Sequence, residues 1–213
     1  MPKADFSHVR DWVFDLDHTL YPANSQLFGQ LEVNMERYLM RVLGLDQAAA
    51  ARRRAQYWRA HGTTLAGMMH HHGTDPVAYL AEVQQIDFSV LRPDPALAKA
   101  IAALPGRKII FTNGSSDYAH RVTNALGLND LFETHFGIDD AGFVSKPHAG
   151  AFEVVFSKAG LQHRQAAMFE DDPRNLEIPH ALGLKTVLVG QPRPARHIHH
   201  QTNDLTTFLG ALT

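Results

Sequence analysis

Two aspartates stand close together near the start of the chain, in the stretch VFDLDHTL of residues 13–20. Val13 and Phe14 are typical of the last buried positions of a strand, and Asp15 and Asp17 follow them directly. Side chains two residues apart on an extended chain point to the same side, so the two carboxylates would repel each other. Neither charge is stable beside a sheet core without a compensating partner. The stretch therefore predicts a site that brings positive charge to these two acids.

Polar side chains also follow two further apolar segments and occupy one loop. The segment IIFTNG ends in Thr112, Asn113 and Gly114, the segment MFEDD ends in Glu170, Asp171 and Asp172, and the loop VSKP carries Lys146. The carboxyl ends of parallel strands meet at one edge of a sheet, so we expect these groups to converge with the two aspartates in a single crevice.

Several acids gathered around one lysine would need a further positive charge. Unpaired buried carboxylates destabilise the folded state or take up protons, whereas a hard divalent cation removes the conflict. Oxygen ligands favour Mg²⁺, which usually keeps bound waters and accepts an oxygen of a substrate phosphate. The Thr112 hydroxyl, the amides of residues 113–114 and the Lys146 ammonium would then bind the phosphoryl group. The sequence thus predicts a magnesium site that acts on a small phosphate ester.

Short apolar segments alternate with helix-like segments after residue 92. Buried parallel strands are predicted at 12–17, 107–114, 166–172 and 184–190, with a weaker candidate at 134–138. Asp94 with Pro95, and Ser116, are predicted to begin helices. Pro173 begins a stretch that Pro179 is expected to divide into two short pieces. The alternation predicts an α/β fold with a doubly wound, Rossmann-like parallel sheet core.

Residues 22–91 have a different pattern. Apolar residues recur there at helical spacing, namely Phe28, Leu31, Met35, Leu39 and Val42. Asp46, Thr63 or Thr64, and Asp75 with Pro76 are predicted to begin three more helices, with no strand-like segment between them. We therefore expect residues 1–21 and 92–213 to form the α/β core and residues 22–91 an α-helical cap subdomain inserted after the first strand. An insertion there lies at the carboxyl edge of the sheet, where it would act as a lid.

The composition limits the possible partners and location. The 213 residues carry a formal net charge of −2, which argues against binding to a nucleic-acid polymer or a membrane surface. The sequence has no cysteine, which excludes zinc–thiolate sites, disulfides and thiol catalysis. The first residues, MPKADFSHVRD, lack the apolar segment of a signal peptide, and no run is long enough to span a bilayer, so we expect a cytoplasmic protein. The oligomeric state is not readable from the sequence.

Four motifs carry a family resemblance over essentially the whole chain. DLDHT, FTNG, SKP and FEDDPRN, in this order, resemble the four motifs of the haloacid dehalogenase (HAD) superfamily of hydrolases. The chain is most similar to members with a helical C1-type cap after the first motif, including pyrimidine 5′-nucleotidases. The resemblance implies that Asp15 is a nucleophile that forms an aspartyl-phosphate, and that Asp17 is the general acid and base. It also implies that Lys146 is a catalytic residue.

The same resemblance implies the ligands of the phosphate and of the metal. Thr112, Asn113 and Lys146 would hold the phosphate. Mg²⁺ would be bound by the carboxylate of Asp15, the backbone carbonyl of Asp17 and the carboxylate of Asp171. Glu170 and Asp172 have no assigned role in this shell, and Asn175 stands where relatives often carry an aspartate.

The implied function is Mg²⁺-dependent hydrolysis of a small phosphomonoester, with a pyrimidine nucleoside 5′-monophosphate as the expected substrate. A sugar-phosphate phosphatase or a phosphomutase on the same scaffold remains an alternative. A 2-haloacid dehalogenase is disfavoured by Asp17, because attack at carbon requires no acid at that position, whereas an alkoxide leaving group needs a proton. A non-enzymatic phospho-receiver is disfavoured by the DxDxT motif and the inserted lid.

Other residues are assigned from their place in the sequence alone. His18, Tyr21 and Asn24 follow the first motif and are expected to reach the substrate pocket. The histidine clusters at 70–72 and 197–200 are expected to be solvated, because consecutive side chains on a helix point in different directions. The basic run of residues 52–54 is also expected to be solvated, although Tyr57 or Trp58 on the same helix would stack on a nucleotide base if it faced the crevice.

Overall fold

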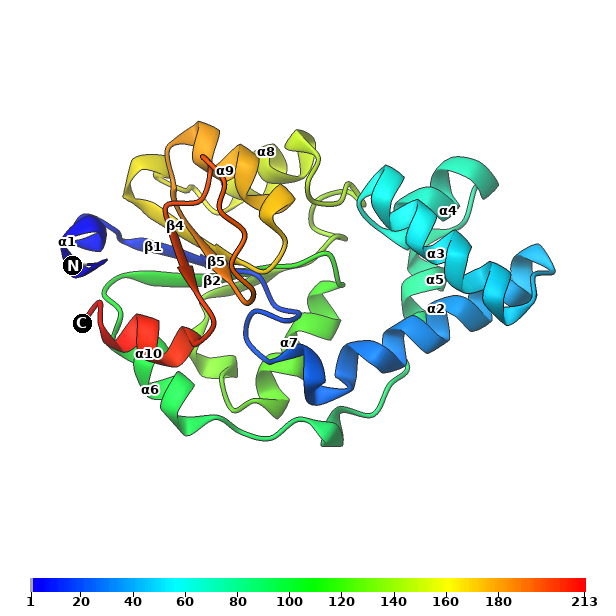
Figure 1. Ribbon diagram of the computed structural model, residues 1–213, viewed down its shortest axis with the longest axis horizontal. Coiled ribbons are helices and arrows are strands. Elements are labelled where there is room, and N and C mark those ends of the chain that lie inside the picture. Colours follow the sequence, from blue (N-terminus) through cyan, green and yellow to red (C-terminus); the bar gives the residue numbers. More distant parts are fainter. Residues whose placement is uncertain (1) are drawn as a thin grey trace.

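Six parallel strands form a single sheet in the computed structural model, which describes residues 2–213 (Figure 1). The strands are β1 (Asp11–Phe14), β2 (Arg107–Phe111), β3 (Thr134–Phe136), β4 (Ala166–Glu170), β5 (Lys185–Val189) and β6 (His200–Thr202). Their order across the sheet is β3-β2-β1-β4-β5-β6, the order of a doubly wound Rossmann-like fold. The predicted α/β class with a parallel sheet is confirmed.

The central strand β1 lies between β2 and β4, where the strand order reverses. Phe14 pairs with Ile110 on one side and with Phe169 on the other. The ladder continues one residue further, because the Asp15 backbone N–H donates to the Phe169 carbonyl oxygen at 2.9 Å. Ligands of such sheets bind at the carboxyl ends of the strands next to this reversal. The residues that follow β1 and β4 therefore lie side by side at the place where a ligand would bind.

Helices cover both faces of the sheet (Figure 1). One face packs against α6 (Pro95–Ala103), α7 (Ser116–Ala125) and α10 (Leu205–Gly210), and the other against α8 (Ala149–Lys158) and α9 (Glu177–Leu182). Side chains of β1 alternate accordingly, with Trp12 and Phe14 in the first core and Val13 in the second. A short helix, α1 (Pro2–Phe6), precedes β1. Burial on both faces explains why β1, β4 and β5 consist mainly of apolar residues.

Side chains at the helix starts explain most of the predicted boundaries. The Asp94 carboxylate accepts the Leu97 N–H and caps α6. Helix α7 begins at Ser116, as predicted, and the Ser115 hydroxyl caps it by accepting the Tyr118 N–H. Residues 173–182 form two short pieces, as predicted, but the break precedes α9. Pro179 lies in the first turn of α9, where the missing N–H removes no helical hydrogen bond.

The inserted segment contains four helices that lie together at one side of the molecule (Figure 1). They are α2 (Leu27–Leu43), α3 (Gln47–His61), α4 (Thr64–His72) and α5 (Pro76–Val83). Asp46, Thr63 and Asp75 cap the last three of these helices through their side chains, as expected from the sequence. No strand occurs among residues 22–91, all of which the structure describes. The division at residues 22 and 91 remains a prediction.

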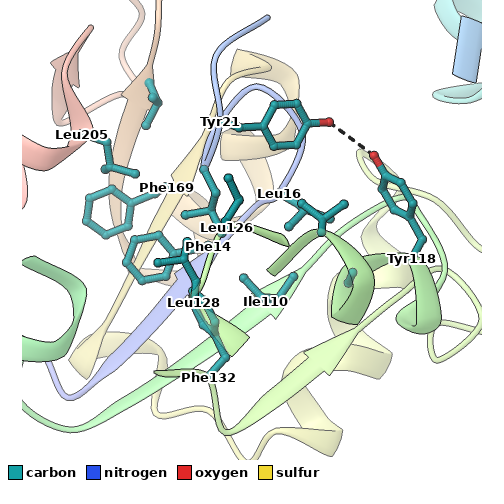
Figure 2. Close-up of a cluster of buried hydrophobic side chains, with 14 of the residues drawn as sticks. Phe14, Leu16, Tyr21, Ile110, Tyr118, Leu126, Leu128, Phe132, Phe169 and Leu205 are labelled. Atoms are coloured by element: carbon teal, nitrogen blue, oxygen red, sulfur yellow. Dashed lines mark hydrogen bonds between the residues drawn. The ribbon is translucent and has the colours of Figure 1, made fainter. Parts of the chain in front are cut away.

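An aromatic and aliphatic cluster lies beneath the carboxyl ends of the strands (Figure 2). Phe14 and Phe169 stack with ring centroids 4.8 Å apart, and Ile110 lies in the same cluster. At the edge of the cluster, the hydroxyls of Tyr21 and Tyr118 face each other at 3.3 Å (Figure 2). These two tyrosines bring polar atoms from the core to the floor of the crevice.

Strand β6 was not predicted, because its sequence is polar and rich in histidine. His199 anchors the segment that leads into it, since its Nδ1 lies 2.8 Å from the Thr186 Oγ1 and its backbone N–H donates to the Thr186 carbonyl oxygen. Within the cluster at 197–200, only His200 belongs to β6, and His197 and His200 are half-buried while His199 is exposed. The expectation of a solvated cluster thus holds only in part there, whereas His70, His71 and His72 are exposed as expected. Short 3₁₀ turns complete the chain, at Ala23–Ser25, Phe88–Val90, Asn129–Leu131, His163–Gln165 and Pro173–Leu176. None of the helices described between residues 2 and 213 has both the length and the apolar character needed to cross a membrane.

Candidate active site

Lys146 joins the ends of β1 and β4 through two buried carboxylates. Its Nζ donates to Asp15 Oδ1 at 2.8 Å and to Glu170 Oε2 at 2.7 Å. The third donor goes to the Phe111 carbonyl oxygen at 2.8 Å, so all three ammonium hydrogens have acceptors in the protein. Burial opposes the charged form of Lys146, but Asp15 and Glu170 outweigh burial and raise its pKa. Lys146 is thus a fixed, fully buried positive charge beside Asp15.

The backbone of Lys146 is held by the second motif. Asn113 Oδ1 accepts the Lys146 backbone N–H at 2.8 Å, and Asn113 Nδ2 donates to the Lys146 carbonyl oxygen at 3.1 Å. Thr112, which is buried, accepts the Gly114 N–H through Oγ1 at 3.0 Å. The Asn113 side chain therefore positions Lys146, and the Gly114 N–H already has an acceptor within its own turn.

Asp17 is held by two tyrosines at the floor of the crevice. Tyr118 donates its hydroxyl to Asp17 Oδ1 at 2.7 Å, and Tyr21 donates to the same oxygen. Burial raises the pKa of Asp17, which these two hydrogen bonds oppose without cancelling. Burial, followed by the charge of Asp17, raises the pKa values of both tyrosines, so they remain neutral donors. Because both bonds go to one oxygen, the Asp17 carboxyl is oriented while its second oxygen accepts no hydrogen bond from the described residues.

Three carboxylates meet at the ends of β1 and β4. Oxygens of Asp15, Glu170 and Asp171 lie within 4.8 Å of one another. Burial, together with the charges of Asp171 and Asp17, raises the pKa of Asp15 to about 6 although Lys146 opposes the shift. Burial and the charge of Asp15 likewise raise the pKa of Glu170 well above its ordinary value. The single ammonium of Lys146 does not balance three carboxylates, so the cluster has an excess of negative charge.

A divalent cation fits this donor set. Asp15, Glu170 and Asp171 offer hard oxygen ligands. Asn175 lines the same cavity, and its Oδ1 is buried with no hydrogen-bond partner among the described residues. Both the excess negative charge and the unpartnered oxygen would be satisfied by a bound cation and its waters. The imidazole Nδ1 of His18 lies 3.6 Å from Asp171 Oδ2, where it partly offsets the charge of that carboxylate. Against the effect of burial, this contact lowers the pKa of Asp171.

The remaining acids of the fourth motif have structural partners. Glu170 Oε1 accepts the backbone N–H groups of Asp171 and Asp172 at 3.2 Å. Asp172 is tied to Arg174, whose Nε and Nη2 donate to the carboxylate at 3.0 and 2.6 Å. The three adjacent acids therefore have different partners. Arg174 pairs with Asp172, whereas Asp171 lies in the carboxylate cluster with Asp15 and Glu170.

A cavity of about 510 Å³ opens above these groups and extends into the helical cap. Asp15, Asp17, Thr112, Asn113 and Asp171 line it, together with His18 and Asn175. Lys146 and Tyr21 are buried beneath the cavity and support residues that line it. Asn24 is exposed and lies outside the cavity lining, so the expectation that it reaches the substrate pocket is not supported by its position.

The comparisons with known proteins agree with this geometry. A family model described as haloacid dehalogenase-like hydrolase matches residues 12–183. The chain belongs to this family. The hydrolase is 28% identical to Phosphate metabolism protein 8 of Saccharomyces cerevisiae over 176 residues, which cover 75% of this chain and 54% of the yeast protein. It therefore spans about half the length of that relative.

Solved structures share the fold of the hydrolase. A HAD phosphatase from Thermococcus onnurineus matches with a TM-score of 0.64 and 17% identity over 96% of this chain and 98% of the other. The HAD hydrolase YfnB of Bacillus subtilis, solved bound to magnesium, matches with a TM-score of 0.62 and 17% identity over 96% and 99% of the two chains. Identities this low establish the fold alone, so the chemistry of the hydrolase has to be argued from its own residues.

The cap contributes charged and aromatic side chains that the sequence did not place. Arg54 lines the cavity and pairs with Glu32 at 2.7 Å and with Glu36 at 3.1 Å, so the expectation of a solvated basic run is wrong at this position. Trp58 also lines the cavity, with the Arg174 guanidinium 4.0 Å from its ring centroid. Tyr57 instead packs against Gly67, where an added Cβ would come within 2.3 Å of its ring. Helical periodicity alone gave no means of deciding which of these side chains faces the crevice.

Direct contacts hold the cap of the hydrolase against its core. Ser115 donates its hydroxyl to Gln84 Oε1 at 2.6 Å, which joins the start of α7 to the end of α5. The Ser145 hydroxyl donates to the His61 carbonyl oxygen at 3.3 Å, next to the loop that carries Lys146. Gly62 lies against the same loop, where an added Cβ would be 2.7 Å from the Lys146 carbonyl oxygen. The cap thus closes directly over the residues of the crevice.

Proposed function

We propose that this hydrolase is a phosphatase that cleaves phosphomonoesters through an aspartyl-phosphate on Asp15. The observation that carries the proposal is the different environment of the two aspartates in one cavity. Asp15 contacts a buried ammonium, whereas Asp17 is held by two neutral tyrosine hydroxyls that leave one oxygen free to exchange a proton. A phosphatase needs both a nucleophile and such an acid, because an alkoxide is a poor leaving group without a proton.

The proposed reaction has two steps that use the same pair of residues. First, an Asp15 oxygen attacks phosphorus, the bond from phosphorus to the leaving oxygen breaks, and Asp17 gives that oxygen its proton. Then the Asp17 carboxylate takes a proton from a water molecule whose oxygen attacks phosphorus, and the bond from phosphorus to Asp15 breaks. Inorganic phosphate leaves, and both carboxyl groups return to their starting states. Throughout, Lys146 stabilises negative charge by its own charge, because its three hydrogens are already donated within the protein.

We assign the cation site to Mg²⁺. The Asp15 and Asp171 carboxylates and the Asp17 backbone carbonyl would bind it, with Glu170 and Asn175 beside them. The oxygen donors favour a hard cation, and YfnB, which shares the fold, was solved with magnesium. When bound, the cation would offset negative charge on the transferring phosphoryl group.

We infer that the substrate is a small metabolite, with a pyrimidine nucleoside 5′-monophosphate as the leading candidate and the inserted helices acting as a C1-type cap. The size of the cavity, about 510 Å³, falls in the range of small-molecule sites. Trp58 provides an aromatic ring in its wall, which suits a substrate with a planar group. The similarity to Phosphate metabolism protein 8 is compatible with a phosphate ester as the substrate.

The decisive experiment compares wild type with Asp15→Asn on p-nitrophenyl phosphate in the presence of Mg²⁺ and in the presence of a chelator. The variant should lose turnover while its circular dichroism and Tm stay close to wild type, because asparagine has the same shape. Asp117→Asn serves as the control, since Asp117 is exposed on α7 and does not line the cavity. Wild-type turnover by Asp15→Asn would refute the nucleophile. Isomerisation of a sugar phosphate without phosphate release would identify a mutase instead.

A further inference from the structure

Three arginines line the cavity of the candidate active site, and two of them have no acidic partner. The Arg54 guanidinium pairs with Glu32 and Glu36. The side chains of Arg59 and Arg193 form neither an ion pair nor a hydrogen bond with any residue that the structure describes. Both side chains are exposed, so a molecule bound in the cavity can reach them. The cavity wall therefore carries two positive charges that the protein leaves without a counter-charge.

The acids of the cavity lining are engaged elsewhere. Glu32 pairs with Arg54, and Asp172 pairs with Arg174. The remaining acids lie at the floor of the cavity, around Lys146 and the proposed cation site. The floor is thus acidic, whereas the two unpaired arginines of the wall keep their full charge.

The two unpaired arginines come from separate segments of the chain. Arg59 lies in the last turn of α3, next to Trp58, whose ring centroid is 4.0 Å from the Arg174 guanidinium of the core. Arg193 lies in the loop that follows β5, and its backbone N–H donates to Gln201 Oε1 of β6 at 2.8 Å. One charge thus comes from the cap and the other from the core, each on a segment that a contact holds in place.

The rest of the cavity offers no other place for a second negative charge. The acids at the floor would repel such a group, and the apolar part of the wall, which includes Leu31, Met35 and Leu80, gives it no hydrogen bond. A guanidinium suits it, because its planar N–H donors bind two oxygens of a carboxylate or a phosphate together. Water is a sufficient partner for one exposed arginine, but two unpaired arginines from separate segments along one cavity indicate an anionic ligand.

We propose that the leaving group of the substrate carries a second acidic group, a carboxylate or a phosphate, which Arg59 and Arg193 bind. The scissile phosphate then lies beside Asp15 at the floor, and the acidic end of the leaving group points toward the two arginines. This inference rests on the proposed phosphatase function and narrows its substrate class. Among pyrimidine nucleoside 5′-monophosphates, it favours those with an additional acid on the base or on the sugar.

The test compares phosphate esters that differ in the presence of a second acid. Orotidine 5′-monophosphate and uridine 3′,5′-bisphosphate add a carboxylate and a phosphate, respectively, to uridine 5′-monophosphate. In a smaller pair, 3-phosphoglycerate has a carboxylate where glycerol 3-phosphate has a hydroxymethyl group. Wild type should have a higher kcat/KM for the acidic member of at least one pair, and that pair identifies the acid. Salt should weaken the preference, because both arginines are exposed.

Arg59→Gln and Arg193→Gln should each reduce this preference. The ratio of kcat/KM for the acidic ester to kcat/KM for its neutral counterpart should fall by about ten- to one-hundred-fold, as expected for a lost hydrogen bond to a charged group. The fall should appear mainly as a higher KM for the acidic ester, because the contact is made in the ground state and the transition state alike.

Arg52→Gln is the matched control, since Arg52 is exposed on the same helix as Arg59 but does not line the cavity. This variant should keep the wild-type ratio. A wild-type enzyme that prefers the acidic member of no pair overturns the proposal, as does a preference that either cavity variant retains in full. Both results leave the phosphatase function standing, whereas activity retained by Asp15→Asn would remove the function itself.

Discussion

Lys146 and Glu170 form a buried ion pair, with Nζ 2.7 Å from Oε2 and each side chain only 1% exposed. The same ammonium lies 2.8 Å from Asp15 Oδ1. A loop residue thereby joins the ends of two neighbouring strands, and its charge partly offsets the repulsion between their acids. Removing the ammonium is costly because both carboxylates stay buried without a counter-charge, whereas neutralising Asp15 leaves Lys146 paired with Glu170.

Lys146→Met should accordingly destabilise the protein as well as inactivate it. Methionine keeps most of the length of the side chain but leaves Asp15 and Glu170 unpaired, so the free energy of unfolding should fall by about 3–5 kcal/mol. Urea denaturation without divalent cations measures this loss. Lys158→Met is the control, since Lys158 is half-exposed and its replacement should change stability by less than about 1 kcal/mol. Equal stabilities for wild type and Lys146→Met would mean that the pair makes no net contribution.

Asp17→Asn should separate the two steps of the proposed reaction. Asparagine keeps an oxygen that accepts the Tyr21 and Tyr118 hydroxyls but holds no proton for the leaving group. With an alkyl phosphate, kcat should fall by about 10²–10⁴-fold. With p-nitrophenyl phosphate, whose leaving group needs no proton, one equivalent of p-nitrophenolate should appear in a burst before slow turnover. Rapid-mixing absorbance measures the burst, and equal losses on both substrates without a burst would contradict the role of Asp17.

The local features of this fold were readable from the sequence because they depend on near neighbours. Asp46, Asp75 and Asp94 cap the helices they were expected to cap, and the polar ends of β1 and β4 do meet. Strand β6 was not predicted because its residues are polar and pair only at an edge of the sheet. Side-chain contacts between residues far apart in the sequence were not predicted either.

The two tyrosines on Asp17 illustrate that limit. Tyr118 is separated from Asp17 by 101 positions, and its role follows only once α7 packs beside β1. Tyr21 was expected in the substrate pocket, yet it lies beneath the site and holds the acid. The direction of a cap side chain such as Arg54 likewise depends on how four helices pack, which a helical period does not specify.

Mg²⁺ should raise the Tm of the wild-type protein, because a ligand that binds only the folded state stabilises it. At a concentration about one hundred times its Kd, the gain should be about 2.7 kcal/mol. Asp171→Asn removes one of the three clustered carboxylates and should lose most of this gain, whereas Asp117→Asn should keep it. Thermal unfolding at constant ionic strength, with and without Mg²⁺, measures the difference. An equal shift in all three proteins would place the cation elsewhere.

His135 should make the stability of the protein depend on pH, away from the active site. Its Nε2 lies 2.9 Å from the Thr123 hydroxyl, and burial, followed by the charge of His120, lowers the pKa of His135 from 6.5 to about 4. Below pH 6.5, His135 therefore binds a proton in the unfolded chain but stays neutral in the folded state until the pH approaches 4. The stabilisation is complete above that pH and is lost as the pH falls toward 4, by about 2 kcal/mol when solvent screening is allowed for.

Urea titrations over this pH range should show the effect as a difference between variants. His135→Gln keeps a side chain that bonds Thr123 but does not titrate, so its stability should fall less steeply with acid than that of wild type. His70→Gln, which changes an exposed imidazole on α4, should follow the wild-type curve. Because other groups titrate in both proteins alike, only the gap between the wild-type and His135→Gln curves reports on His135. Parallel curves would show that His135 gains its proton as readily in the folded state as in the unfolded chain.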